Sequence, residues 1–197
     1  MQDPTYRHHT VTAPNGTLPV SLEEARRQLR TEGMTFDDDL VQLLIQAAAS
    51  NIEVQYGLGL LEQTVRQYHA GFPATANDPM FIWVAPLMSI NSITYIDTSG
   101  ATQTFDAADY TSGGFNGWPF IVPKVGKSWP IAASGLPNAV TIVYTAGFGA
   151  TAASIPKEIK QAILLMVGDL YENRQDRPDN LPRASKSLLK PYSRFPG

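Results

Sequence analysis

The chain has 197 residues, 43% of them hydrophobic and 17% charged, and a formal net charge of −3. A chain of this length buries roughly 70% of its unfolded surface, which allows one sizeable core or a core with a small inserted module. The lack of cysteine excludes disulfides and thiolate metal sites, and the acidic balance argues against general affinity for nucleic acids. The N-terminus lacks the apolar stretch of a signal peptide and no apolar run approaches the ~20 residues of a membrane helix, so we expect a soluble protein made in the cytosol.

The chain begins with a predicted arm and a short helix. Residues 1–18 contain two prolines and an Asn-Gly pair, which are typical of an extended arm. Residues 21–24, Ser-Leu-Glu-Glu, match a capping box, in which the serine hydroxyl and the second glutamate satisfy each other's backbone amides. This box predicts the start of a helix that we expect Gly33 to end.

A second helix is predicted from residue 37 onward. Three aspartates at residues 37–39 place negative charge where a helix dipole is positive. We expect them to cap the helix, because they lack the spacing of oxygen ligands in a calcium loop. Apolar residues then recur at helical spacing as far as Tyr56, and Gly57 supplies the stop.

Between residues 61 and 153 the pattern changes from helical to extended. β-branched and aromatic residues gather in four segments that turn signals separate, namely residues 64–68, 80–84, 90–96 and 140–144. These segments predict an antiparallel β module inserted between helices.

The helical pattern returns after the module. Pro156 suits the first turn of a helix that continues to Arg174. Its expected buried stripe consists of Ile159, Ala162, Ile163, Met166, Val167 and Leu170. The predicted fold class is α+β, a small helical bundle of about three main helices with an inserted antiparallel β module. Residues 19–60 and 154–174 form the helical core, and residues 61–153 form the insert.

The last segment, residues 175–197, is predicted to be a basic arm that docks on a partner. It has no acidic residue after Asp179, and its apolar density is too low to offset the entropy of ordering it. Apolar side chains are nevertheless interleaved with the positive charges, which a purely solubilising tail rarely shows. The residues expected to dock are Arg183, Lys186, Leu188, Leu189, Lys190, Tyr192, Arg194 and Phe195.

The sequence offers little chemistry for catalysis. His8 and His9 are adjacent on an extended chain and point in opposite directions, which leaves His69 as the one candidate for an ordered imidazole base. The glycines at 147 and 149 lack the third glycine and the immediate helix of a dinucleotide loop, and no Gly-x-Ser-x-Gly elbow occurs. A pair of carboxylates far apart in the chain is not excluded. We therefore expect no catalytic residue, no cofactor and no metal.

Two tryptophans leave an alternative open. Trp118 and Trp129 each precede a proline within the β module. Tryptophan often anchors an interface, and it is equally common in the core of a small β module.

The order of these segments resembles that of the tailed-phage head–tail connector (head-completion adaptor) family, in its longer members with an inserted β module. The opening helix is similar at residues 19–26 and 29–30, and the second helix at residues 38–41, 44–48 and 52–53. The β module is similar at residues 86–97, 123–126, 128–130 and 140–148, and the closing helix at residues 155–156, 159–160, 162–165 and 170–174.

This resemblance implies a structural protein of the virion neck, made in the cytoplasm of a host bacterium. Members of the family form a ring of about a dozen copies beneath the portal, a cyclic assembly with heterologous contacts. The implied partners are the portal ring, neighbouring copies and a downstream stopper or terminator, with genomic double-stranded DNA passing through the channel without sequence-specific binding and with no membrane. The family offers no catalytic residues to transfer to this chain.

Two other interpretations stay open. The chain could instead be another neck or tail-completion (stopper) protein, which sequence separates poorly from an adaptor. More distant alternatives are a small glycan-active enzyme on the β module and a carbohydrate-binding module that uses Trp118 and Trp129.

Overall fold

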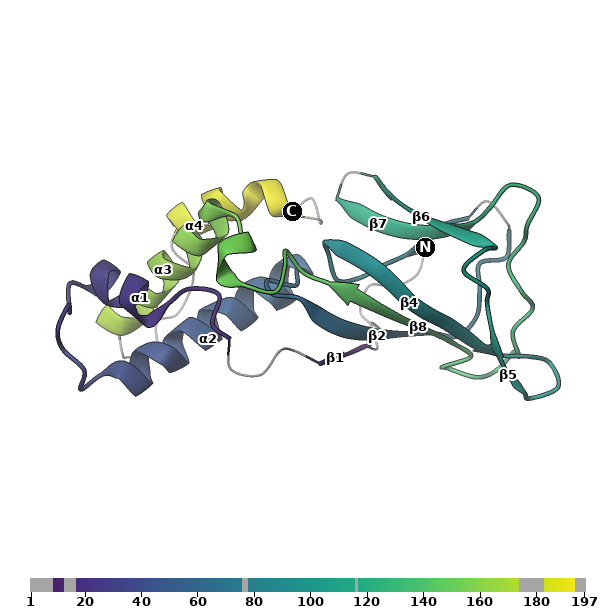
Figure 1. Cartoon of the computed structure of the whole chain (residues 1–197), viewed down its shortest axis with the longest axis horizontal. Helices are drawn as coiled ribbons and strands as arrows, with labels where there is room; N and C mark the ends of the chain where they lie inside the picture. Colours follow the sequence, from purple (N-terminus) through teal and green to yellow (C-terminus); the bar gives the residue numbers. More distant parts are fainter. Residues whose placement is uncertain (1–8, 13–16, 76–77, 116, 174–182, 194–197) are drawn as a thin grey trace. The chain divides into compact units, whose positions relative to one another are not determined.

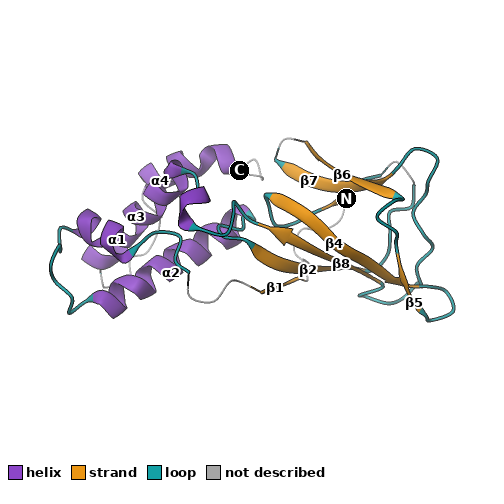
Figure 2. Ribbon diagram, viewed as in Figure 1, coloured by secondary structure: helices purple, strands orange, loops and turns teal. Residues whose placement is uncertain are grey.

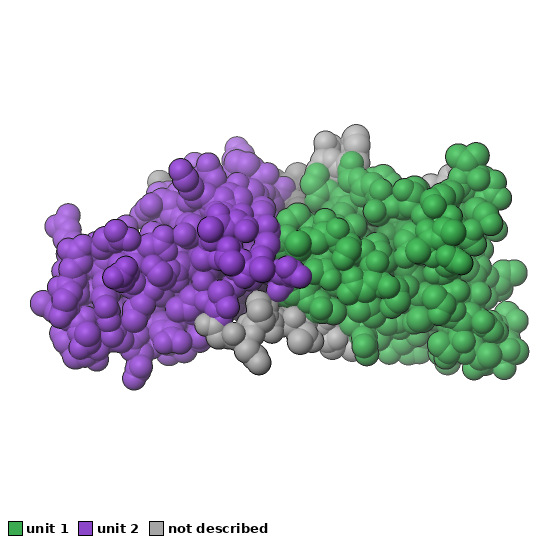
Figure 3. Space-filling model, in the orientation of Figure 1, with its two compact units in different colours: residues 1–13, 63–147 green, residues 14–62, 148–197 purple. Residues whose placement is uncertain are grey.

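The structure is a computed structural model that describes residues 9–12, 17–75, 78–115, 117–173 and 183–193 (Figure 1). The described residues form four α-helices and two antiparallel sheets, which confirms the predicted α+β class (Figure 2). The chain divides into two compact units (Figure 3). We call residues 1–13 and 63–147 the β unit, and residues 14–62 and 148–197 the helical unit. None of the helices in the described segments is both long and apolar enough to cross a bilayer.

The helical unit contains all four α-helices and two short 3-10 turns. They are α1 (Leu22–Leu29), α2 (Asp38–Tyr56), η1 (Ala152–Ser154), α3 (Lys157–Glu172), α4 (Arg183–Leu189) and η2 (Lys190–Tyr192). The capping box at the start of α1 is confirmed, because Ser21 Oγ accepts from the Glu24 amide at 3.1 Å and Glu24 Oε2 accepts from the Ser21 amide at 2.7 Å. Gly57, with φ of 63°, ends α2 as predicted.

One predicted helix end and one predicted cap are wrong in detail. Arg30, with φ of 57°, ends α1 in the left-handed conformation, three residues before Gly33. Asp37 stands at the start of α2 without a side-chain capping bond. Its carboxylate instead accepts a hydrogen bond from the Tyr171 hydroxyl of α3, so tertiary contacts have displaced the local cap.

The core of the helical unit lies between α2 and α3. Its largest contributions come from one stripe on each helix, namely Val41, Ile45, Ala48 and Ile52 on α2, and Ile159, Ala162, Ile163, Met166 and Val167 on α3. Leu170 was expected in the same stripe, but it is 40% exposed. Helical spacing gives the direction in which a side chain points. Burial also requires that another element of the fold pack against that part of the helix.

The C-terminal segment also differs from the prediction of a poorly buried arm. Its described part forms α4 and η2, and α4 packs against α3. Ser185 and Leu189 are fully buried, and Leu188 and Tyr192 pack against the same core. These four positions recur at helical spacing, so the segment has an amphipathic pattern that its low overall apolar density concealed.

The β unit consists of two antiparallel sheets around one core. The five-stranded sheet has the order β1 (His9–Thr12), β2 (Gln63–His69), β8 (Val140–Ala146), β4 (Leu87–Ile96) and β5 (Thr102–Thr104). The three-stranded sheet has the order β3 (Met80–Phe81), β7 (Trp118–Pro123) and β6 (Tyr110–Phe115). Both sheets contribute to the same core, for example Ile142 from the first and Ile121 from the second.

Three predicted strands match β2, β4 and β8, whereas the fourth, residues 80–84, is a strand only at β3. Part of the predicted N-terminal arm, β1, pairs with β2 in the register His9 to Gln67. Alternate residues of β2 and β8 face the core, as antiparallel sheets with one buried face require. Buried positions in β2 include three polar side chains, Gln63, Gln67 and His69.

Candidate interaction surfaces

The predicted docking residues of the C-terminus separate into a buried and an exposed set. Leu189 is fully buried and belongs to the helical core, and Leu188 is half-buried against it. Lys186 and Lys190 are exposed, on α4 and at the start of η2. Arg183 begins α4, while its side chain, like Arg194 and Phe195, lies outside what the structure describes. Among the described residues of this segment, the exposed charges are therefore cationic, and both leucines contribute to the core.

Tyr192 is held against the helical unit by two contacts. Its ring meets Phe148 edge-on, with ring centroids 6.2 Å apart, and its hydroxyl donates to Glu158 Oε2 at 3.5 Å. Partial burial and the nearby Glu158 carboxylate raise the pKa of Tyr192. The residue thus fixes η2 on α3, and it presents only part of its surface to a partner.

The two tryptophans have different environments in the β unit. Trp129 is 8% exposed and belongs to the core, where its ring stacks on Phe72 with centroids 5.2 Å apart and planes 19° apart. Its indole N–H donates to the carbonyl of Asp78 at 3.2 Å. Trp118 is half-buried on β7, and its ring meets Phe81 edge-on at 6.0 Å. Trp129 is therefore a core residue, whereas Trp118 keeps one side accessible.

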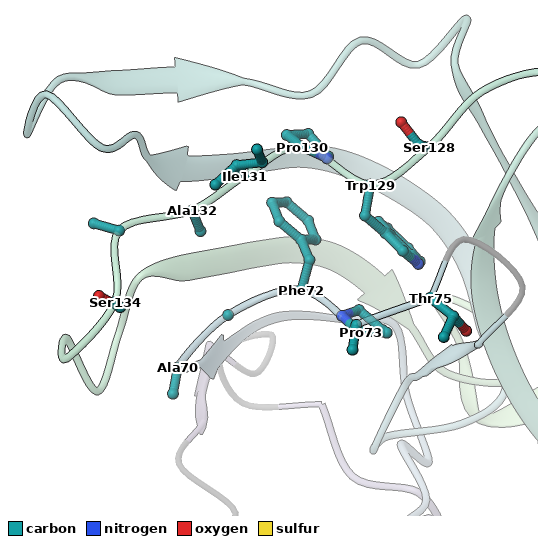
Figure 4. Close-up of a pocket in the computed structure, with 13 residues that line it drawn as sticks. Ala70, Phe72, Pro73, Thr75, Ser128, Trp129, Pro130, Ile131, Ala132 and Ser134 are labelled. Atoms are coloured by element: carbon teal, nitrogen blue, oxygen red, sulfur yellow. The ribbon is translucent and has the colours of Figure 1, made fainter.

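A pocket of about 370 Å³ lies beside Trp129 (Figure 4). Two loop segments line it, residues 70–75 and 128–134. Figure 4 shows the Phe72 ring between these segments, next to Trp129 and facing Pro130 and Ile131. Serine and threonine hydroxyls supply the polar side chains of the lining, which holds neither a carboxylate nor an imidazole. This lining offers no carboxylate or imidazole for general acid–base catalysis.

His69, the candidate base, is part of a buried polar network. The Gln67 side chain donates to the Phe81 carbonyl at 2.8 Å and contacts His69 Nε2 at 2.6 Å, where the neutral ring accepts. Gln67 Oε1 accepts from the Trp83 amide at 3.0 Å and from the Tyr144 hydroxyl at 3.2 Å. The Tyr144 hydroxyl in turn accepts from the amide of Val84 at 3.1 Å.

This network ties the five-stranded sheet to the segment that follows β3. Burial lowers the pKa of His69 to about 4, and its ring lies 5.1 Å from that of Trp83. Every donor and acceptor of the Gln67 amide is used within the unit, so the network explains why Gln67 and His69 stand at core positions of β2. Its role is structural.

Charged pairs join the helices of the helical unit. Arg26 of α1 donates to the Asp38 carboxylate at the start of α2, with Nε at 2.9 Å from Oδ1. Lys160 of α3 donates to Glu24 Oε1 at 2.9 Å. Partial burial opposes the ionisation of Glu24, but the bonds from Lys160 and Ser21 outweigh it and lower its pKa. Within the described residues, no group of three or more metal-ligating side chains gathers.

Comparison with known proteins gives a match at the level of structure. No protein-family model matches the chain, and no curated protein sequence matches it. Its fold is similar to that of chains from gene transfer agent particles. A chain from the neck of the empty particle, at C6 symmetry, superposes with a TM-score of 0.79 and 22% identity over 96% of this chain and 97% of that chain.

Two further structures agree with this match. A chain from the neck of the native particle, at C12 symmetry, gives a TM-score of 0.77 and 22% identity over 97% of this chain and 96% of that one. A chain from the virion of the native particle gives a TM-score of 0.75 and 21% identity, over 95% of this chain and 96% of that chain. The likeness therefore spans both the helical unit and the β unit.

Proposed function

We propose that this protein is a head–tail connector, an adaptor subunit in the neck of a tailed phage or phage-like particle. The observation that carries the proposal is the nearly full-length similarity of fold to chains from the neck of gene transfer agent particles. In this role about a dozen copies form a closed ring beneath the portal, extend the DNA channel and support the next neck or tail protein. The protein works by shape and self-association, without a catalytic residue or cofactor.

The electrostatics of the chain support this role. A channel lined densely with lysine and arginine would hold DNA phosphates and resist sliding. The formal net charge of −3 provides no such excess of positive charge. DNA then passes without sequence-specific binding.

The C-terminal segment is our candidate for portal docking. Lys186 and Lys190 are its exposed charges, joined by Arg183, Arg194 and Phe195, whose side chains are not described. Leu188 and Tyr192 are half-buried, so only their accessible surfaces can contact the portal. Leu189 is fully buried and supports docking only by anchoring the segment in the helical core. The exposed lysines of α4 and η2 would meet acidic groups on the portal.

Reconstitution with purified portal rings tests the role. We expect electron microscopy of the mixture to show a coaxial ring of this protein on the portal, and a cryo-EM map of the particle neck to place it there. Contact with tail proteins alone would instead identify a stopper or tail-completion protein. A particle neck without copies around the DNA channel would contradict both roles.

A further inference from the structure

Helix α2 is apolar on two faces. One face is the buried stripe that meets α3, and the other is an outward stripe of Leu43, Ala47, Ser50 and Val54. Leu43 is 59% exposed and Val54 is 80% exposed. A surface helix of a self-sufficient domain carries polar and charged groups on its outer face, whereas a helix that is apolar on both sides is usually covered.

Past its first turn, where Asp39 is exposed four residues before Leu43, the outer face of α2 carries no exposed charge. From residue 40 to the end of the helix, Glu53 is the single charged residue. Its carboxylate turns inward and accepts from the Leu60 amide at 2.9 Å, and burial raises its pKa. By contrast, α1 and α3 carry exposed charges such as Glu23 and Lys157. Depletion of charge marks the centre of protein–protein interfaces.

A second apolar feature stands directly before this helix. Met34 and Phe36, in the connection from α1 to α2, are 52% and 77% exposed. Together with Leu43 and Val54 they account for four of the ten large exposed hydrophobic side chains in the described chain. Residues 34–54 therefore hold one of the groups of exposed apolar side chains in the described chain.

Small side chains stand in the middle of the outward stripe. Its members follow one another at i, i+4, i+7 and i+11, so it extends about 16 Å along one side of the helix. Ala47 and Ser50 are small and form a floor between the larger Leu43 and Val54. A large ring of a neighbouring copy can pack against small residues that lie between two larger ones, as side chains do in helix–helix contacts.

We propose that Phe36 of one copy, flanked by Met34, docks into the stripe of Leu43, Ala47, Ser50 and Val54 on the next copy. The proposal rests on the connector role, which supplies neighbouring copies. Each copy then carries the ring and the stripe on different residues, so a contact that repeats from copy to copy around a ring is heterologous. Exposed aromatic anchors that fill a partner's pocket are typical hot spots.

The absence of native cysteine makes cross-linking a clean test. We would assemble the full chain carrying both F36C and S50C on portal rings, treat it with a short thiol-reactive linker, and identify the linked peptides by mass spectrometry. We expect a ladder of covalent multimers linked between positions 36 and 50 of different copies. F36C or S50C alone should give no ladder, and neither should the control pair L170C with S50C, because Leu170 lies on α3.

A second variant measures the energetic role of the Phe36 ring. Phe36, Ser50 and Leu170 are all exposed, so variants at these positions should fold like the parent, which circular dichroism checks. We expect Phe36→Ser to weaken association of copies about thirtyfold, as for a hot spot, and Leu170→Ser to leave it unchanged.

Several results would overturn the proposal. A ring on the portal without the 36-to-50 link would refute this contact and leave the connector role intact. Links from position 36 to the portal, or ladders from either single variant, would assign the surface to a different partner or to a symmetric contact. Absence of both ring and links would refute the contact and the connector role together.

Discussion

Gln67 is a single residue whose replacement should disturb the whole β unit. Its amide satisfies the Phe81 carbonyl, the Trp83 amide and the Tyr144 hydroxyl, all within a core where water cannot replace it. We expect Gln67→Leu to lower the free energy of unfolding by about 3 kcal/mol or more, because each stranded buried polar group costs about 1–3 kcal/mol. Urea unfolding measures this loss. Gln161→Leu, at an exposed position of α3, should change stability by less than about 0.5 kcal/mol, and equal effects of the two variants would contradict the network.

His69 should make the stability of the β unit dependent on pH. Burial lowers its pKa in the folded protein to about 4, whereas the unfolded chain titrates near 6.5. Between these values the unfolded state binds a proton that the folded state does not. The free energy of unfolding therefore decreases as pH falls from about 6.5 to about 4, by a total on the order of 3 kcal/mol. Below about pH 4 the titration of His69 causes no further decrease.

The variant His69→Gln isolates this contribution, because it keeps an acceptor for Gln67 and removes the titration. We expect the difference in stability between the parent and this variant to shift in favour of the variant as pH falls from 6.5 to 4. Chemical denaturation at a series of pH values gives the two curves. Parallel curves would show that His69 is not neutral and buried in the folded state.

At the scale of elements, α3 offers a direct comparison of two positions that share a helical stripe. Ile163 is fully buried, whereas Leu170 is 40% exposed. Ile163→Asp should abolish cooperative unfolding of the helical unit, because a buried unpaired charge costs several kcal/mol. Leu170→Asp should cost about 1 kcal/mol or less. Thermal unfolding followed by circular dichroism separates them, and an equally severe effect at both positions would show that Leu170 is covered.

The elements that could be predicted are those whose signals act locally. The capping box at Ser21 and the left-handed stop at Gly57 depend only on their own backbone neighbourhood, and both were correct. The strands β2 and β8 alternate cleanly because one face of each is buried. Leu170 was misplaced because burial depends on a neighbouring element, which helical spacing does not specify.

The elements that were missed have sequences that local rules disfavour. Strand β6 contains Gly113, where a Cβ would lie 2.9 Å from the Phe120 ring, so the glycine serves cross-strand packing that only the fold reveals. Strand β7 contains two prolines, and all three residues of β5 are exposed. Among the candidate surfaces, the exposure of Leu43 and Val54 on α2 needed the structure, because helical spacing does not show which apolar face is covered. The stacking of Trp129 on Phe72 joins residues far apart in the chain and needed the structure.

At the scale of the whole molecule, the chain leaves the helical unit and returns to it at nearly the same place. The Glu62 amide donates to the Gly149 carbonyl at 2.9 Å, so the two ends of the inserted β segment are held together within the helical unit. Leu60 and Leu61, just before the insert, are buried in the helical core, and Phe148 packs against that core just after it. Residues of the helical unit therefore complete its core both before and after the inserted β segment.

This closure predicts that the helical unit folds without the β unit. A chain lacking residues 1–13, with residues 63–147 replaced by a short glycine-serine linker, keeps every member of the helical core, and joining ends that already lie close costs little loop entropy. We expect a helical circular dichroism spectrum and a cooperative thermal transition, both lost on adding Ile163→Asp. A shortened chain that melts without cooperativity would show that the helical unit depends on the β unit for its stability.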